Sequence, residues 1–223
     1  MPLEEPAGHG VLAVYEDADL LVLQKPPGLL CVPGRGPDKQ DCLSARAQQH
    51  WPDALIVHRL DQATSGLVLM ARHLDAQRRL SHAFAERQVH KRYQAVVKGL
   101  LGEVGEIGGA WNDIDLPIAA DWERRPLRII DHALGKPSLT RWRALTHDPA
   151  TQTTRIELEP VTGRTHQLRV HLAAIGHPIL GDALYADAAT QAQAPRLLLH
   201  ASDLAFAHPA TGAWLALEWA ANF

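Results

Sequence analysis

The sequence predicts an α+β fold, built on a mixed and mainly antiparallel sheet with flanking helices and loops. Three observations support this prediction. Segments with strand character outnumber helical segments, the two kinds rarely alternate, and the sequence has no internal repeat. With 223 residues, 46% of them hydrophobic and 21% charged, the chain is typical of a globular domain. We therefore expect one domain over residues 1–223, arranged as two lobes around a cleft.

The first half of the chain contains four predicted strands. Residues 11–16 and 20–25 are strands joined by the turn-forming "DAD", and residues 54–57 and 67–71 are short apolar strands. Between these two pairs lie a loop rich in proline and glycine, "KPPGLLCVPGRGPDK", and a short predicted helix over residues 42–51. The polar segment 58–66 therefore connects two buried strands, a position typical of functional groups.

The second half starts with a helix over residues 74–88, because Ala76, Leu80, Ala83 and Phe84 form one apolar stripe. The remaining elements are predicted from local pattern. They are a strand at 92–99, loops and short strands at 101–137, a hairpin of 140–147 with 153–161 around "DPAT", a helix at 165–176 between an N-cap at Thr165 and Gly176, and strands near 196–201, 204–208 and 214–220. In the strand at 153–161, Ile156 and Leu158 alternate with charged residues, which predicts a half-buried strand.

The charge distribution leaves a nucleic-acid partner open. The formal net charge of −3 argues mildly against binding a polyanion. Basic residues are nevertheless concentrated in two places, which could steer RNA or could equally be solvated faces. The first group is Arg72, Arg78, Arg79, Arg87, Lys91, Arg92 and Lys98; the second is Arg124, Arg125, Arg128, Lys136, Arg141 and Arg143.

Cysteine usage and hydropathy favour a cytoplasmic protein. Cys31 and Cys42 form no CxxC pattern, so we expect reduced structural thiols in a reducing compartment such as a bacterial-type cytoplasm. No apolar run approaches the roughly 20 residues that span a bilayer. The acidic start, "MPLEEPAGHG", has no apolar segment of the kind found in signal peptides. We expect no membrane association.

The segment "HRLDQATSGLVLMAR", residues 58–72, places one carboxylate, Asp61, beside Arg59 and immediately before a buried strand. A partly buried carboxylate stays ionised only where a cation or several donors stabilise it. Arg164, at the junction of a predicted strand and helix, is a second candidate cation. The pair could be an ionised nucleophile or base with its counter-ion. It could equally be a structural salt bridge between two segments.

The sequence lacks the residue patterns of several other common kinds of active site. A glycosidase usually needs a second carboxylate, and Ser65 lacks the Gly-x-Ser-x-Gly context of a serine hydrolase. His166 and His171 are five residues apart, unlike zinc-binding histidines at helical spacing, so we interpret them as core or hydrogen-bonding residues. No P-loop or Rossmann glycine pattern is present. Chemistry by one carboxylate, with no metal and no cofactor, remains.

Residues 58–72 resemble the signature segment of the RluA family of RNA pseudouridine synthases. Four further segments resemble family motifs in the family's order, so the resemblance spans most of the chain from about residue 11. They are "LVLQKPPGLLCVPG", "HKRYQAVVKG", "LEPVTGRTHQLRVHLAAIGHPILGDALY" and "RLLLHA". The resemblance implies the pseudouridine synthase fold, a single catalytic domain with no N-terminal S4-like domain, and activity on stem-loops of 23S rRNA and tRNA. It implies no cofactor, and we expect a monomer.

The resemblance also implies residue roles. Asp61 is the catalytic aspartate, which attacks the sugar, attacks the base or removes a sugar proton. Arg164 pairs with it, and Tyr93 stacks on the uracil and is a candidate for proton removal from C5. Because the target base must leave its stack, Arg59 occupies the gap that it leaves. The predicted RNA-binding residues are Arg59, His58, Thr64, Lys91 and Leu168.

Structural alternatives remain for several of these residues. His58 could shape its loop, Thr64 and Ser65 could cap the following turn, and Leu168 could be a helix-core residue. At the level of the whole protein, the alternatives are a related synthase with another RNA target, a non-catalytic RNA-binding module of the same fold, and a hydrolase acting on nucleosides. We expect the basic groups to contact phosphates, which position RNA without reading its bases.

Overall fold

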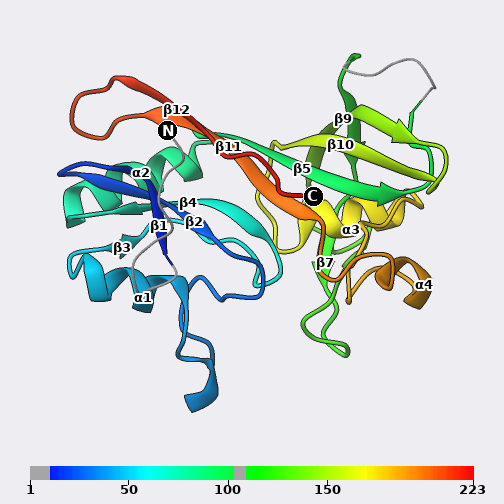
Figure 1. Cartoon of the computed structure of the whole chain (residues 1–223), viewed down its shortest axis with the longest axis horizontal. Helices are drawn as coiled ribbons and strands as arrows, with labels where there is room; N and C mark the ends of the chain where they lie inside the picture. The colour runs from blue at the N-terminus through cyan, green and yellow to red at the C-terminus, as the bar shows by residue number, and fades with distance from the viewer. Residues whose placement is uncertain (1–10, 103–108) are drawn as a thin grey trace. The chain divides into compact units, whose positions relative to one another are not determined.

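The computed structural model describes residues 11–102 and 109–223, so the N-terminal segment used above to argue against a signal peptide lies outside it. The chain forms two compact units (Figure 1). The first contains the chain up to His90 together with Ala201–Ala221, and the second contains Lys91–His200 together with Asn222–Phe223. The boundaries fall within strands β5 (His90–Lys98) and β11 (Leu199–Ala207).

The sheet of the first unit is built on antiparallel pairs. β1 (Leu12–Glu16) pairs with β2 (Leu20–Lys25), β2 and the short β3 (Leu55–Ile56) pair with β4 (Ser65–Ala71), and β11 pairs with β12 (Trp214–Glu218). The predicted turn between β1 and β2 is confirmed, because Asp17 Oδ1 accepts hydrogen bonds from Asp19 N (2.8 Å) and Leu20 N (2.9 Å). Every residue of β4 is buried.

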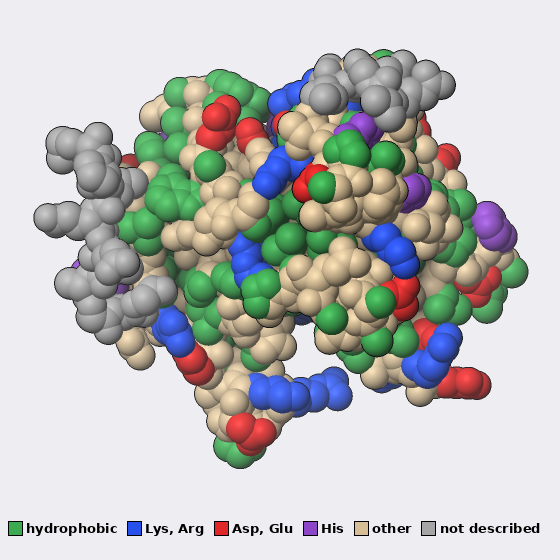
Figure 2. All heavy atoms as spheres, turned by 45° about the vertical axis from the view of Figure 1, so that its right-hand side comes forward, with side chains coloured by type: hydrophobic (Ala, Val, Ile, Leu, Met, Phe, Trp, Pro, Cys, Tyr) green, Lys and Arg blue, Asp and Glu red, His purple; other side chains and the backbone are tan. Residues whose placement is uncertain are grey.

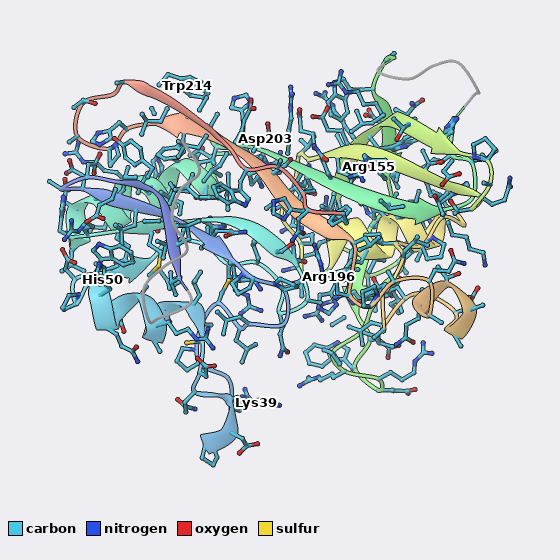
Figure 3. All side chains as sticks on the ribbon, viewed as in Figure 1. Lys39, His50, Arg155, Arg196, Asp203 and Trp214 are labelled. Carbon is cyan, nitrogen blue, oxygen red and sulfur yellow. The ribbon has the colours of Figure 1, made fainter. Side chains whose placement is uncertain are left out.

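Helices α1 (Leu43–His50) and α2 (Leu74–Ala85) are drawn on opposite sides of β2 and β4 in Figure 1. α2 follows the predicted apolar stripe: Ala76 and Leu80 are buried in one core with β2, β4 and β11 residues, and Ala83 and Phe84 pack against its edge. A 3-10 turn, η1 (Pro37–Lys39), occurs in the predicted loop, where Lys39 is labelled in Figure 3.

The second unit contains an antiparallel ladder of β5, β10 (Thr153–Pro160), β9 (Leu139–Asp148) and β6 (Asn112–Asp115). A separate hairpin joins β7 (Ile118–Ala120) to β8 (Arg128–Ile130). The helices are α3 (Gln167–Ala174) and the short α4 (Ala188–Gln191). The predicted hairpin around "DPAT" is confirmed, because Asp148 Oδ1 accepts from Ala150 N (2.9 Å) and Thr151 N (3.3 Å).

Three details of the prediction are wrong. The strands expected at 196–201 and 204–208 form the single strand β11. α3 begins at Gln167 with His166, at φ 57°, as its N-cap, and not with Thr165. Glu157 in β10 is buried where a solvent-facing residue was expected, because Arg143 (2.6 Å) and Arg92 (3.6 Å) neutralise it.

Many of the basic residues are paired within the protein. In Figure 2, lysine and arginine side chains form separate groups, several of them beside acidic side chains. Ion pairs involve Arg72 with Asp53 and Glu16, Arg79 with Asp75, Lys98 with Asp187, Arg124 with Asp121, and Arg141 with Asp113 and Glu159. Exposed pairs of this kind stabilise little, but they reduce the charge available to a polyanion. Within the described ranges, no helix is long and apolar enough to cross a membrane.

Candidate active site

The predicted site residues divide between the two units. His58, Arg59, Asp61 and Thr64 lie in the first unit, whereas Lys91, Tyr93, Arg164 and Leu168 lie in the second. The meeting of Asp61 with Tyr93 and Arg164 stays a prediction.

Asp61 lies in the connection between β3 and β4, as the sequence predicts, and its side chain is half-buried. Its backbone carbonyl accepts a hydrogen bond from Thr64 N (3.1 Å), which closes a tight turn. Thr64 and Ser65 are buried at the start of β4. The burial of Thr64 fits the structural alternative of a role in the turn, and its contact with RNA stays a prediction.

Lys25, a residue that the sequence analysis did not single out, is fully buried beside this connection. Its Nζ donates hydrogen bonds to the carbonyls of Pro26 (2.8 Å), Leu29 (2.7 Å) and Gln62 (3.0 Å). Burial lowers the pKa of Lys25 to about 8, while the neighbouring Cys31 and Asp61 act in the opposite direction. The lysine therefore links the strand end, the proline-rich loop and the residue that follows Asp61.

Further hydrogen bonds connect the same two loops. Gly28 N donates to Gln62 O (2.8 Å), and Gln62 Nε2 donates to Gly28 O (3.0 Å). Gly28 has φ +86°, a conformation that glycine adopts without strain. On the other side of Asp61, Leu60 N donates to Cys31 Sγ (3.2 Å). The backbone around Asp61 is thus fixed on both sides by hydrogen bonds within the protein.

His58 has the contacts of a loop-shaping residue. Its Nε2 accepts a hydrogen bond from Leu69 N (2.9 Å), and its ring stacks on Phe84 with centroids 4.4 Å apart. The β3–β4 pairing ends at Ile56 and Met70, and the His58 ring accepts the hydrogen bond of the next β4 residue, Leu69. Arg59, in contrast, is exposed. Its guanidinium, two residues before Asp61, is open to solvent, and its contact with RNA stays a prediction.

In the second unit, Tyr93 lies on β5 opposite Leu158 of β10 and is half-buried. Lys91 shares its face of the strand, since side chains two residues apart point the same way. Burial lowers the pKa of Lys91. A Cβ placed on Gly163 would lie 4.0 Å from Lys91 Nζ, so the amine is close to the segment that carries Arg164.

Arg164 is exposed in the segment between β10 and α3, and Gln167 holds that segment in place. Gln167 Oε1 accepts from Thr162 Oγ1 (2.7 Å) and Arg164 N (3.0 Å), and its Nε2 donates to Leu139 O (2.9 Å). Sequence reasoning missed Gln167. The N-cap of α3 is His166, one residue later than the predicted Thr165, and Gln167 is the first residue of the helix.

α3 itself is anchored through buried polar groups. Arg169 donates to both carboxylate oxygens of Asp182, from Nε (2.8 Å) and NH2 (2.6 Å). His171 is buried, with Nδ1 and Nε2 within hydrogen-bond distance of Thr140 Oγ1 (3.0 Å) and Leu116 O (2.9 Å), which confirms it as a hydrogen-bonding core residue. Leu168 is also buried, as expected for its helix-core alternative, and its contact with RNA stays a prediction.

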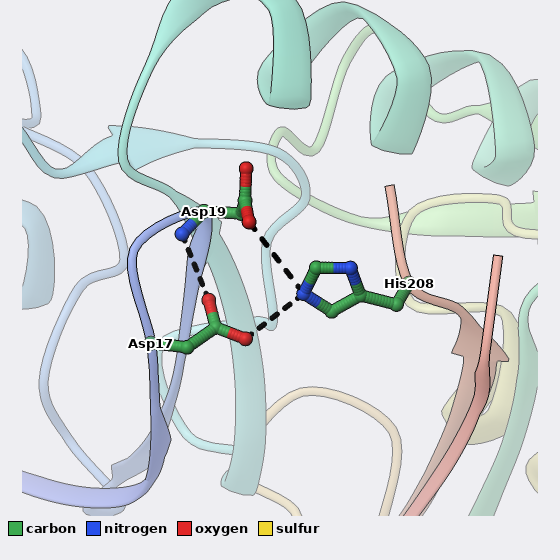
Figure 4. Close-up of side chains that lie close together, drawn as sticks. All are labelled: Asp17, Asp19 and His208. Atoms are coloured by element: carbon green, nitrogen blue, oxygen red, sulfur yellow. Dashed lines mark hydrogen bonds and ion pairs between the residues drawn. The ribbon is translucent and has the colours of Figure 1, made fainter. Parts of the chain in front are cut away.

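One group in the described part of the chain has the residue types of a metal site: Asp17, Asp19 and His208 (Figure 4). His208 Nδ1 accepts hydrogen bonds from the backbone N–H groups of Ala210 and Thr211, both 3.2 Å away. The ring proton is therefore on Nε2, which donates to Asp17 Oδ2 (2.9 Å). A protonated nitrogen does not bind a metal, so the chemistry of this group is that of a hydrogen-bonded link between two hairpin turns.

Comparisons with known proteins find matches that cover most or all of the chain. Residues 19–174 match the family model described as RNA pseudouridylate synthase. The chain is 42% identical over 222 residues to the dual-specificity RNA pseudouridine synthase RluA of Escherichia coli strain K12, covering 100% of this chain and 97% of that protein. A protein of the same name from Pasteurella multocida is 45% identical over 205 residues, covering 92% and 90%. The solved structure of human RNA pseudouridylate synthase domain containing 1 matches with a TM-score of 0.78 and 30% identity, covering 97% of this chain and 86% of that one.

Proposed function

This chain belongs to the RNA pseudouridylate synthase family, and we propose that it converts uridines to pseudouridine in stem-loops of both 23S rRNA and tRNA. The observation that carries the proposal is the family match over residues 19–174, which includes the fixed connection around Asp61. The dual target is inferred from similarity along the full chain to proteins that are named for dual specificity.

The reaction is an isomerisation within one nucleotide. The bond between ribose C1′ and uracil N1 breaks, the base turns, and C1′ bonds to C5. C5 loses its proton and N1 gains one, so the reaction is balanced without an oxidant, a reductant or water. A single carboxylate with a stacking aromatic residue is a sufficient set of groups for this chemistry.

We assign the catalytic role to Asp61, with Tyr93 stacking on the uracil and Arg164 as the counter-ion of the aspartate. Support for Asp61 comes from its surroundings: Lys25 and Gly28 hold the backbone after it through Gln62 O, and Cys31 holds the backbone before it through Leu60 N, so the residue that carries the carboxylate has a fixed backbone. Arg59 replaces the flipped base in the stack of the stem-loop. Its exposure supports that role.

The test uses an RNA stem-loop that carries tritium at C5 of its uridines, because C5 releases its proton only when pseudouridine forms. We expect tritium release by the wild-type protein and none by Asp61→Asn, while RNA binding persists. Asp75→Asn is the matched control, since Asp75 is an exposed carboxylate of the same unit paired with Arg79.

Each alternative predicts a different product. A nucleoside hydrolase would release free uracil, whereas a synthase releases none. A non-catalytic RNA-binding module would bind the stem-loop without releasing tritium. Turnover by Asp61→Asn at the wild-type rate would refute the assignment of Asp61. Pseudouridine at only one of the two RNA classes would refute dual specificity while leaving the isomerase activity intact.

A further inference from the structure

The β7–β8 hairpin of the second unit carries an exposed tip, residues 121–127, that extends away from the strands (Figure 1). The tip is closed by backbone hydrogen bonds from Asp121 N to Leu127 O (3.1 Å) and from Leu127 N to Arg124 O (3.0 Å). These hydrogen bonds fix the backbone of the tip. A binding element of this kind loses little conformational entropy on association.

The buried carboxylate of Asp121 organises the tip. It accepts hydrogen bonds from Arg124 N (3.1 Å) and Arg124 Nε (2.8 Å), and it forms an ion pair with Arg124 NH2 (2.7 Å). These hydrogen bonds, led by the one from the Arg124 backbone, hold the pKa of Asp121 below its ordinary value. The charge of Arg124 is therefore used inside the tip. Arg125 is the other arginine of residues 121–127, and Glu123 is the other acid.

Trp122 is the most exposed of the six tryptophans, with 72% of its surface accessible. The guanidinium carbon of Arg125 lies 4.1 Å from the centroid of its ring, over one face. Within residues 11–102 and 109–223, Arg125 forms no ion pair, so its N–H groups remain available to an anion. Singly exposed apolar side chains are common and assign nothing by themselves. The combination of an open indole face, a guanidinium on the other face and a preset loop is more specific.

We propose that Trp122 and Arg125 form a platform on which an unpaired base of the RNA substrate stacks, with Arg125 also contacting an adjacent phosphate. The inference rests on the proposed function, which supplies the RNA. Unpaired bases of RNA loops stack on aromatic rings and on guanidinium planes, and this stacking does not depend on the identity of the base. The platform would hold nucleotides outside the catalytic position and so contribute to affinity for loops over duplexes.

The first experiment measures binding to a short fluorescent RNA hairpin with a uridine-containing loop, and to a blunt RNA duplex of the same stem. We expect Trp122→Ala to bind the hairpin about tenfold more weakly than the wild type, the size of one lost base stack. Binding to the duplex should change much less. Trp122→Phe should retain most of the affinity, because a phenyl ring still stacks.

Trp214→Ala is the matched control, because Trp214 is also an exposed tryptophan, at 57%, on a hairpin of the first unit (Figure 3). Its ring contacts His90 edge-on at 5.4 Å instead of a guanidinium. We expect this variant to bind both RNAs as the wild type does. Equal affinity of wild type and Trp122→Ala for the hairpin would overturn the platform.

A second experiment identifies the stacked base. Each loop nucleotide is replaced in turn by an abasic one, and the wild type is compared with Trp122→Ala on every hairpin. At the contacted position the difference between the two proteins should vanish, because the partner of Trp122 is gone. A difference that persists on every abasic hairpin would rule out stacking. If the wild type forms pseudouridine but Trp122→Ala binds the hairpin with unchanged affinity, only the platform is contradicted. If the wild type forms no pseudouridine, the proposed function is contradicted.

Discussion

The ammonium group of Lys25 donates a hydrogen bond to the backbone carbonyl of Gln62, 3.0 Å away and one residue beyond Asp61. A fully buried lysine is rare unless its charge is compensated. Here three carbonyls accept its three N–H groups. These hydrogen bonds offset part of the free-energy cost of burying the cation. They also fix the backbone beside the predicted catalytic carboxylate.

Lys25→Met should lower both stability and turnover. The buried hydrogen bond to the carbonyl of Leu29 is lost at a cost of about 1–3 kcal/mol of unfolding free energy, and a displaced Asp61 lowers turnover by roughly tenfold to a hundredfold. Urea denaturation and single-turnover isomerisation measure the two effects. Lys39→Met, in an exposed turn, is the control. A variant as active as the wild type would show that the lysine does not position Asp61.

Lys25 should also produce a pH dependence of stability in the alkaline range. Its pKa is about 8 in the folded protein and ordinarily 10.5, so between these values the unfolded chain binds more protons. The contribution of Lys25 to the unfolding free energy therefore rises with pH across this window, by at most about 1.4 kcal/mol per pH unit. It is constant below the folded pKa. Urea denaturation at a series of pH values should give a steeper rise for the wild type than for Lys25→Met, and equal slopes would contradict this.

Asp182→Asn should destabilise the second unit strongly. Removing one partner of a buried ion pair leaves the guanidinium of Arg169 uncompensated, at a cost of about 3–5 kcal/mol. Asp182 Oδ1 also accepts from Leu184 N (2.9 Å) and Tyr185 N (3.2 Å). Thermal denaturation measures the loss. The exposed pair of Lys98 and Asp187 provides the comparison, and Asp187→Asn should cost far less.

Gly66→Ala should prevent correct folding of the first unit. Gly66 has φ +119°, and a Cβ there would lie 2.3 Å from the carbonyl oxygen of Ala201. Gly212→Ala meets open space at φ +71°, so only backbone strain opposes it, at about 1 kcal/mol. Soluble yield and circular dichroism distinguish the two variants. Similar stability of both proteins would mean that β4 and β11 separate easily.

Arg59→Ala should lower the rate of isomerisation of a folded stem-loop about tenfold, the value of one stacking interaction. The rate on an unstructured oligonucleotide should fall much less. Only a stacked base leaves a gap for the guanidinium to occupy. Arg78→Ala, also exposed in the same unit, is the control. Equal losses on both substrates would argue against a role of Arg59 in flipping.

The fold class and most element positions could be predicted because periodicity is strong in this chain. β4 is a continuous apolar run and α2 has an apolar stripe, and both were located within a few residues. Similarity to the human synthase structure confirms the α+β pseudouridine synthase fold. Glu157 was misplaced because its burial depends on two arginines from neighbouring strands, and local alternation carries no information about them.

The site was predicted less completely, for a related reason. Asp61 and its loop position follow from local sequence, but Lys25 and Gln167 act through carbonyls and hydroxyls of segments distant in sequence. Lysine at the end of a strand ordinarily reaches solvent, so nothing in its immediate neighbours predicted a buried amine. The proline-rich segment after it, "PPGLL", was the available signal that the chain turns back over the side chain.

The connection over residues 57–64 receives hydrogen bonds from Lys25 and Gly28, reaches Cys31 through Leu60 N, and is secured to Leu69 through the His58 ring. Inserting or deleting one residue there would shift the register of the segment, so that several of these hydrogen bonds would be lost at once. The β9–β10 turn at 149–151 relies on contacts within its own few residues. An affinity tag, a fluorophore-bearing peptide or a new chain terminus therefore belongs in that turn, whereas the first connection accepts changes of side chain but not of length.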